Sequence, residues 1–416
     1  MTLPHSPRRR LGARGVLGLL ATTIMVLSST MAAGSTATAS THPDIGDVGA
    51  ATAIPGSYIV VLADSAVGGR AGTRQAALAA TASSLASRYG GTLGRVYGDA
   101  LNGFQIHLSE SAARRLARDP AVAYVEQDRT VELTTTQNNA PWNLDRIDQP
   151  ALPLSTTYNF TSQGTGVKAY IIDSGVQIGH QDFGGQAIYG YDAIDGLPPA
   201  NDCLGHGTHA AGTVGGTWWG VAKDVVLVAV KVYDCGAASS LAIIISGINW
   251  VTADHLPGQP AVANLGVQGS YSNALNTAVT NSIADGVTYT VAAGNSNANA
   301  CNYSPGSTPN AITVGATTSS DARASWSNFG PCLDFFAPGV TVTSTWHTSI
   351  SATNSLSGTS QAAPHLAGAA ARVLSNNPTW TPAQVQSYLA STATIGVVTN
   401  PGTGSPNRLL YLSPTG

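Results

Sequence analysis

Three residues that together could perform nucleophilic catalysis stand far apart in the chain: Asp173, His206 and Ser360. Asp173 follows an apolar run, so it would lie beyond the carboxyl end of a strand. Glycines flank His206 and leave room around its imidazole. Ser360 opens the Ala-rich stretch 361–374, a helix start from which its Oγ can point outward. A serine whose proton passes to a histidine held by an acid is the arrangement of acyl transfer.

Each of these residues has a plainer explanation when taken alone. An Asp-Ser-Gly after a strand is usually a turn, and a serine at a helix start is usually an N-cap. A zinc site at His206 would need the carboxylate of an HExxH-type motif, which the segment lacks. We expect the nearby His209, like His365, to pack inside a helix. The order Asp, His, Ser is one of the known triad orders, and it favours catalysis.

Asn295 strengthens this interpretation. It lies shortly after the apolar run 287–292, so it too would be near the carboxyl end of a strand. Its amide could donate a hydrogen bond to an oxyanion, together with the Ser360 backbone N–H. The alternative is a turn-forming asparagine. Four such residues at the ends of elements are a much stronger signal than any one of them.

The elements expected to position these residues alternate between strand and helix from residue 134 onward. Continuous apolar runs at 167–172, 225–232, 261–267 and 287–292 predict buried strands, with helices near 241–253 and 273–284. Thr381 and Gln384 predict a capping box for a late helix with Pro382 at its first position. The alternation predicts an α/β fold, a parallel sheet with helices on both faces.

The amino terminus has the pattern of a secretory signal peptide over residues 1–39. Arginines at positions 8, 9, 10 and 14 precede an apolar run from Val16 to about Met31, and small residues follow. The run is short for a membrane anchor, which is the alternative. The Arg-Arg pair leaves both the general and the twin-arginine export route open. We expect an exported, extracellular protein without a membrane segment once the signal is removed.

Residues 40–133 are expected to form a separate unit, with a folded part at about 54–133. The patterns predict strands at 58–62, 104–108, 122–125 and 130–133, and helices at 74–89 and 111–118, the second capped by Ser109. This order suggests a small α+β unit of ferredoxin-like type. A charge shift near residue 133 and the polar stretch 134–139 predict a linker into the second unit, 134–416.

Composition excludes some classes of function. The formal net charge is −3 and charged residues make up only 10% of the chain, so no nucleic-acid partner is indicated. An even number of cysteines in an exported chain favours disulfides, with three pairings open. Zinc is the weaker alternative, because no two cysteines have CxxC-like spacing. The cysteines are Cys203, Cys235, Cys301 and Cys332.

Four segments carry a resemblance to a known family: Ile172-Asp173-Ser174-Gly175, His206 to Gly212, Ala292-Ala293-Gly294-Asn295 and Gly358 to His365. They resemble the motifs of the subtilases, specifically the proteinase K branch with its aqualysin-like bacterial members. The stretch 140–149 is also similar to that branch, and residues 54–133 resemble the family's inhibitory prodomain. The resemblance implies a secreted, monomeric serine endopeptidase of broad, mainly hydrophobic primary specificity, made as an autoprocessed zymogen.

The resemblance also implies roles for single residues. Ser360 would be the nucleophile, His206 the general base and acid, and Asp173 the residue that orients the imidazole. Asn295 and the Ser360 N–H would form the oxyanion hole, and no catalytic cofactor is needed. The implied disulfides are Cys203–Cys235 and Cys301–Cys332. A structural calcium ion is implied at the carbonyls of Pro309 and Ala311 and the carboxylate of Asp334, oxygen ligands that suit a hard cation.

The segments that the resemblance places beside a polypeptide substrate depart from the family pattern. Gly266-Val267-Gln268-Gly269 stands in place of Ser-Leu-Gly-Gly, and Ala238-Ser239-Ser240 in place of Ser-Gly-Ser. Ala293 and Gly294 complete the expected substrate-binding set. Gln268 should narrow the pocket wall and alter subsite preference. A second departure is Gln361, where subtilases usually have methionine directly after the nucleophile.

The prodomain is expected to act as intramolecular chaperone and inhibitor, with its tail in the active-site groove. Cleavage after Leu133 would fit a hydrophobic preference, and cleavage after Thr134 is equally open. One alternative class is a catalytically dead binding protein, against which the intact Asp, His, Ser and Asn argue. Another is a lipase of the α/β-hydrolase kind, whose G-x-S-x-G elbow is missing around Ser360 and whose triad order differs.

Overall fold

The computed structural model describes residues 45–46, 53–67, 71–129, 135–196 and 199–414. The chain divides into two compact units, Met1–Thr130 and Val131–Gly416. The expected signal peptide, the expected strand at 130–133 and both candidate cleavage positions lie outside the described residues. Within the described part, no helix combines the length and the apolar character that crossing a bilayer requires.

The first unit is a four-stranded antiparallel sheet with two helices. Its elements follow in the order β1 (Ala53–Leu62), α1 (Ala71–Tyr89), β2 (Thr92–Tyr97), β3 (Gly103–His107), α2 (Glu110–Leu116) and β4 (Val122–Arg129), with a short 3-10 turn at Asp64–Ala66. The strand order β2-β3-β1-β4 is that of the expected ferredoxin-like unit. Leu78, Ala82 and Leu85 bury one side of α1. Ser109 caps α2, as the sequence predicts.

Two expectations for this unit were wrong in detail. The sequence pattern misses β2, which lies at the sheet edge with every residue at least partly exposed, so its apolar alternation is weak. The strand expected at 122–125 continues to Arg129, because pairing with β1 extends it past its apolar residues.

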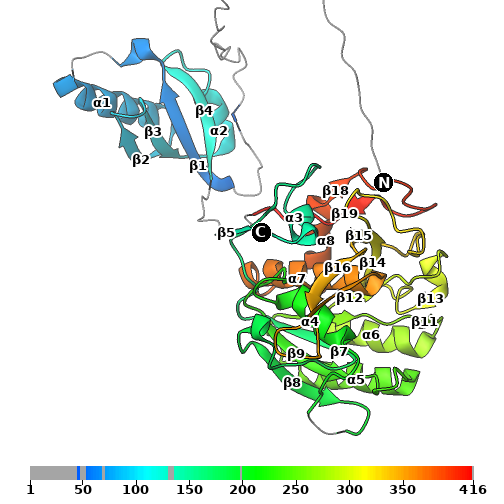
Figure 1. Ribbon diagram of the computed structural model, residues 1–416. Coiled ribbons are helices and arrows are strands. Elements are labelled where there is room, and N and C mark those ends of the chain that lie inside the picture. Colours follow the sequence, from blue (N-terminus) through cyan, green and yellow to red (C-terminus); the bar gives the residue numbers. More distant parts are fainter. Residues whose placement is uncertain (1–44, 47–52, 68–70, 130–134, 197–198, 415–416) are drawn as a thin grey trace, which may run out of the picture. The chain divides into compact units, whose positions relative to one another are not determined.

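The second unit contains a nine-stranded sheet in the order β18-β19-β15-β14-β12-β10-β7-β9-β8 (Figure 1). Neighbouring strands are parallel except for β18 against β19. The strands are β7 (Lys168–Asp173), β8 (Ala187–Asp192), β9 (Val226–Lys231), β10 (Ala261–Leu265), β12 (Thr288–Ala292), β14 (Ile312–Thr317), β15 (Phe335–Pro338), β18 (Thr394–Ile395) and β19 (Arg408–Leu409).

Helices cover both faces of this sheet, which confirms the predicted α/β fold. One apolar cluster joins the sheet to α3 (Trp142–Ile147), α4 (His206–Gly215), α7 (Thr359–Asn376) and α8 (Pro382–Thr392). A second cluster joins the opposite face to α5 (Leu241–Asp254) and α6 (Asn273–Asp285). The capping box that Thr381 and Gln384 predict is present at the start of α8. Ala-rich α7 is buried from Thr359 to Leu374, since small side chains allow close packing.

Short strands complete the unit, and one of them corrects the expected linker. The polar stretch 134–139 contains β5 (Thr135–Asn138), which pairs with β6 (Thr157–Phe160). Its polar side chains give no strand pattern, because backbone pairing with a distant segment holds it. The other pairs are β11 (Gly269–Ser270) with β13 (Tyr303–Ser304) and β16 (Val342–Thr345) with β17 (Thr353–Leu356); 3-10 turns lie at Gln181–Phe183 and Ala300–Asn302.

The sheet reverses its winding direction beside β7. From β7 the chain goes on to β8 and β9 on one side, and then crosses to β10 and β12 on the other. In open α/β sheets, ligands bind at such a switch point, beyond the carboxyl ends of the strands. The fold therefore predicts a site above the ends of β7, β10 and β12.

Candidate active site

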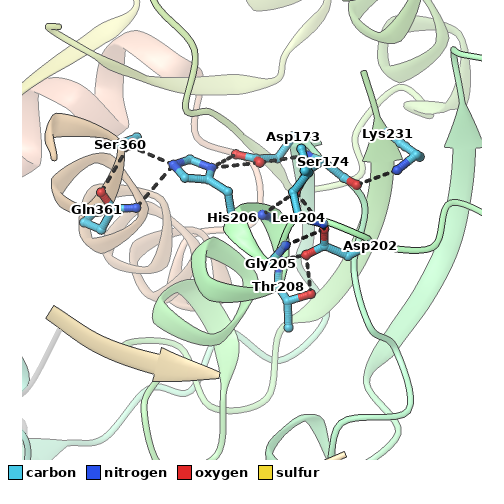
Figure 2. A network of polar contacts seen from close by, with 11 residues as sticks. Asp173, Ser174, Asp202, Leu204, Gly205, His206, Thr208, Lys231, Ser360 and Gln361 are labelled. Carbon is cyan, nitrogen blue, oxygen red and sulfur yellow. Dashed lines mark hydrogen bonds and ion pairs between the residues drawn. The ribbon is translucent and has the colours of Figure 1, made fainter. Parts of the chain in front are cut away.

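Asp173, His206 and Ser360 meet at this switch point. Asp173 is the last residue of β7, His206 the first of α4, and Ser360 lies in the first turn of α7. The His206 Nδ1 atom is 2.8 Å from both Asp173 carboxylate oxygens, and its Nε2 is 2.9 Å from Ser360 Oγ. Figure 2 shows the three side chains in a row, with the imidazole in the middle. His206 is 33 positions from Asp173 and 154 positions from Ser360 in the sequence, yet the three residues form one hydrogen-bond relay.

Electrostatics favour a basic imidazole at this position. Burial by itself would lower the pKa of His206, but the adjacent Asp173 carboxylate and the nearby Asp202 outweigh it, so the pKa is raised above its ordinary value. The Asp173 side chain is 2% exposed and the His206 side chain 31% exposed, so the acid is enclosed while the base faces the solvent side. That exposure pattern suits a base that receives a proton from a reacting group.

Asp202 anchors the loop that leads into His206, and sequence reasoning missed it. Its Oδ1 accepts hydrogen bonds from Ser174 Oγ and from the Leu204 and Gly205 backbone N–H groups. Its Oδ2 accepts from the backbone and hydroxyl of Thr208. Figure 2 shows this cluster beside His206, next to Ser174 and on the side away from Ser360. An aspartate just before a helix start is an available signal, because such residues often organise the turn.

The glycines beside His206 have the role that the sequence predicts. Gly205 has a φ of +93°, and a Cβ there would lie 2.5 Å from the Trp346 ring. A Cβ at Gly207 would lie 2.1 Å from the Gly175 carbonyl oxygen. Both positions therefore require glycine for the backbone to approach closely enough to place the imidazole.

The start of α7 is tied to the end of β12 through Asn295. The N-cap of α7 is Gly358, so Ser360 is not the ordinary N-cap of the alternative explanation. Asn295 Oδ1 accepts hydrogen bonds from the Thr359 backbone N–H and hydroxyl, both at 2.9 Å. This fixes the amide and leaves its Nδ2 on the side of Gly358, where a Cβ would lie 3.6 Å from Nδ2 and 3.1 Å from Ser360 Oγ. The Asn295 amide N–H donor and the Ser360 hydroxyl thus both lie next to the space beside Gly358.

Gly266 brings the expected substrate segment against the relay. It directly follows β10, and a Cβ on it would lie 3.0 Å from Asp173 Oδ2 and 3.4 Å from Ser360 Cβ. A cavity of about 310 Å³ opens here, lined by Asp173, Ser174, Leu204, His206, Tyr233, Ala237 and Gly266.

Gln268, which we expect to narrow the pocket wall, bridges two segments. Its Oε1 accepts a hydrogen bond from the Asn295 backbone N–H at 2.8 Å, and its Nε2 donates to Ser296 Oγ at 3.1 Å. The side chain lies over Gly294, where a Cβ would be 2.6 Å from Gln268 Cδ. Gly294, with a φ of +103°, and Ala293 connect β12 to Asn295.

The other expected substrate segment, Ala238-Ser239-Ser240, is irregular and borders α5. The Ala238 backbone exchanges hydrogen bonds with Asp234, and the Ser239 hydroxyl donates to the Val232 carbonyl. Ser240 is the N-cap of α5 and accepts from the Ile243 N–H. The hydroxyls of Ser239 and Ser240 are thus used within this segment.

The two remaining histidines of the motifs are structural, as expected. His209 and His365 have no exposed surface, and burial lowers the pKa of each to about 4. His209 Nε2 lies 2.9 Å from the Val342 carbonyl, and His365 lies against Asn143 and the Gln361 carbonyl. Both stay neutral at ordinary pH and hold α4 and α7 in place.

Both disulfides that the resemblance implies are present, Cys203–Cys235 and Cys301–Cys332. The first joins the loop before α4 to the loop after β9, which are two loops at the site edge of the sheet. Each bond spans a little over 30 residues and constrains the unfolded chain, which contributes roughly 3–4 kcal/mol in the chain-entropy model.

The expected calcium ligands gather at the starts of β14 and β15. Asp334 precedes β15, and its Oδ2 accepts from the Thr313 N–H on β14 while its Oδ1 accepts from Gln386 Nε2. Burial raises the pKa of Asp334 to about 6. Asn310, with a φ of +67°, reverses the chain between Pro309 and Ala311. The described residues hold no cluster of three metal-ligating side chains, so a cation here would depend on backbone carbonyls.

Comparisons with known proteins identify the family of this chain. Residues 164–410 match the subtilase family (Peptidase S8) and residues 57–134 match peptidase inhibitor I9. An extracellular serine proteinase of Thermus sp. (strain Rt41A) is 47% identical over 96% of this chain and 99% of its own. Alkaline serine exoprotease A of Vibrio alginolyticus is 46% identical over 76% of this chain and 59% of its own. A crystal structure of a cold adapted subtilisin-like serine proteinase, 47% identical, superposes with a TM-score of 0.64 over 66% of this chain and 98% of that one. The chain therefore belongs to the subtilase family and carries an N-terminal inhibitor I9 domain.

Proposed function

We propose that this chain is the precursor of an exported serine endopeptidase with Asp173, His206 and Ser360 as its catalytic triad. The observation that carries the proposal is the relay of 2.8 and 2.9 Å hydrogen bonds from carboxylate through imidazole to hydroxyl. The relay lies at the switch point of an α/β sheet and beside an amide donor, which is where a peptide carbonyl could react.

The reaction follows from the positions of the groups. Ser360 Oγ attacks the carbonyl carbon of the scissile peptide while its proton passes to His206 Nε2. Asp173 holds the Nδ1–H and stabilises the imidazolium that forms. The new oxyanion accepts hydrogen bonds from Asn295 Nδ2 and the Ser360 N–H. His206 then donates its proton to the leaving amine, and a water molecule repeats the sequence to release the acyl group.

Covalent labelling combined with protein digestion tests this assignment. A fluorophosphonate reacts with an activated serine, so the mature protein should become labelled and lose its ability to digest casein. A binding protein without catalysis would do neither. A lipase would be labelled, yet it would leave casein intact and cleave esters of long-chain fatty acids.

We further propose that residues 1–39 are an export signal, that 40–133 are the inhibitory prodomain and that 134–416 are the peptidase. The I9 match over 57–134 and the unit boundary after Thr130 support this division. Extracellular relatives such as the Thermus proteinase support export. Because the I9 match ends at residue 134, it is compatible with cleavage after Leu133 and after Thr134.

A calcium ion is proposed at Pro309, Ala311 and Asp334. The two carbonyls and one carboxylate are hard oxygen ligands, and a cation would offset the cost of burying the Asp334 charge. Each Asp334 oxygen accepts one hydrogen bond and retains a second lone pair for the ion. The ion would tie β14 to β15 and contribute to stability, with no part in the chemistry.

Chelation should destabilise the enzyme through this site. With calcium at about 100 times its Kd, binding stabilises the fold by about 2.7 kcal/mol, so EDTA should lower Tm by roughly 5 °C. The measurement is calorimetry of fluorophosphonate-inhibited protein, in which autolysis cannot occur. Asp334→Asn should start from the lower Tm and show no response to EDTA, whereas an equal response in both proteins would contradict the site.

We propose that Gln268 sets the primary specificity by closing a gap between two substrate segments. The resemblance places Gly266–Gly269 and Ala293–Asn295 on either side of the primary pocket, and Gln268 crosses between them. A broad hydrophobic preference would then be biased towards smaller side chains, because the amide occupies space that a glycine would leave open.

Gln268→Gly should open this pocket. The ratio of kcat/KM for substrates with phenylalanine against alanine before the scissile bond should rise about tenfold, which is a typical effect of such a volume change. A peptide library read by mass spectrometry measures the profile. Ser296→Ala is the matched control, because it removes one hydrogen bond and leaves the Gln268 side chain in place. A Gln268→Gly profile equal to that of the parent would remove this role.

A further inference from the structure

The side-chain amide of Gln361 lies inside the catalytic relay. Gln361 is 2% exposed, and its Oε1 accepts a hydrogen bond from Ser360 Oγ at 3.2 Å. Its Nε2 lies 3.2 Å from His206 Nε2, the same nitrogen that Ser360 Oγ approaches at 2.9 Å. Figure 2 shows the resulting triangle of hydroxyl, amide and imidazole. The amide therefore contacts both groups between which the proton must move.

The positions of the protons follow from the partners of the imidazole. His206 Nδ1 faces the Asp173 carboxylate, so it carries the proton in the neutral ring, and Nε2 presents a single lone pair. Two donors, the Ser360 hydroxyl and the Gln361 N–H, compete for that lone pair. The hydroxyl also has a second acceptor in Gln361 Oε1. When the hydroxyl donates to the amide oxygen, the amide N–H is free to donate to the imidazole.

We propose that Gln361 is a positioning residue that holds His206 in its neutral, proton-accepting form by donating its amide N–H to Nε2. This role rests on the proposed function, since it acts through the triad. A protonated Nε2 would direct its N–H at the amide N–H, so the imidazolium loses this hydrogen bond. Gln361 therefore opposes the protonation of His206 by solvent at low pH. A methionine at this position would leave that protonation unopposed.

Other titratable groups near the imidazole set a background that substitutions at position 361 leave unchanged. Asp173 on β7 and Asp202 in the loop before α4 both favour the imidazolium. His209 on α4 and His365 on α7 are buried and neutral. Tyr233 lines the neighbouring cavity, and His347 lies beside Gly205. Comparing variants at position 361 alone therefore isolates the effect of the amide.

The test is the pH dependence of kcat/KM for a chromogenic peptide, measured on the mature parent, Gln361→Met and Gln361→Glu. The acidic limb of this profile reports the pKa of the base in the free enzyme. Methionine fills similar space without a hydrogen-bond donor, so the midpoint of the acidic limb of Gln361→Met should shift to higher pH by about 0.5 to 1 unit. This shift is the effect of a three- to tenfold change in a protonation equilibrium. Glutamate keeps the side-chain shape of glutamine and adds a negative charge that favours the imidazolium, so the midpoint of its acidic limb should shift to a still higher pH.

The midpoint pH of the acidic limb should therefore be lowest with glutamine at position 361, higher with methionine and highest with glutamate. Superimposed limbs for the parent and Gln361→Met would overturn the proposal, because a residue that only fills space would give that result. A midpoint pH for Gln361→Glu equal to or lower than that for Gln361→Met would also overturn the proposal. Gln361→Leu, a second apolar variant, should match methionine and serves if either of the others fails to mature.

A second readout does not depend on substrate turnover. The rate of fluorophosphonate labelling at each pH also requires a neutral His206, and it should show the same order of limbs. If the parent neither reacts with the fluorophosphonate nor cleaves peptides, the proposed function itself fails. If the parent is active and the limbs coincide, only the role of Gln361 fails.

Discussion

Replacing Ser360 by alanine is expected to lower kcat for peptide hydrolysis by about 10⁶-fold, the loss measured when the nucleophile of another subtilase is removed. The methyl group cannot attack a carbonyl, and His206 then has no hydroxyl proton to accept at 2.9 Å. Because maturation uses the same chemistry, the variant should also remain a full-length precursor. Casein digestion, a chromogenic peptide and gel electrophoresis of the secreted protein measure both effects.

Ser319→Ala is the control for this experiment, because Ser319 is an exposed residue outside the segments that form the relay. It should mature normally, and sequencing the amino terminus of its mature form should give a start at Thr134 or Thr135. A Ser360→Ala chain that matures by itself and digests casein would show that the triad is elsewhere, and the proposed function would fall with it.

Removing the side chain of Asn295 should give the second largest effect. Asn295→Ala is expected to lower kcat by about 10² to 10³-fold, the loss measured for this kind of donor in another subtilase, with little change in KM. The reason is that the donor acts on the oxyanion, which exists only in the transition state and the intermediate. Steady-state kinetics on a peptide substrate separate the two parameters.

Asn295→Asp tests whether this loss is chemical or structural. The aspartate keeps an oxygen that can accept from the Thr359 N–H and hydroxyl, so the link between β12 and α7 is retained. The second oxygen replaces the Nδ2 donor and repels an oxyanion. The loss in kcat should therefore be at least as large as for alanine. A variant close to the parent in kcat would mean that Asn295 only connects the two loops.

The buried strands around the site could be predicted from sequence because parallel strands covered on both faces contain continuous apolar residues. The runs at 167–172, 225–232, 261–267 and 287–292 correspond to β7, β9, β10 and β12 within a few residues. By contrast, β8 is the edge of the sheet, and only two of its six residues are buried. The β5 segment is polar throughout. Backbone hydrogen bonds to segments distant in the sequence stabilise such strands, so the local pattern of apolar residues does not reveal them.

The sequence by itself determined which residues could form the relay, their order along the chain and the elements that carry them. Those properties are local: Asp173, His206 and Ser360 lie at the ends of elements whose patterns can be recognised in short windows. Only the tertiary structure decided the hydrogen-bond partners around them. Asp202 organises the loop that leads into His206, and Gln268 bridges to the Asn295 backbone. Gln361 contacts His206 although the two residues are 155 positions apart in the sequence. The direction of each side chain depends on how the strand ends and α7 pack together, which no short window of sequence contains.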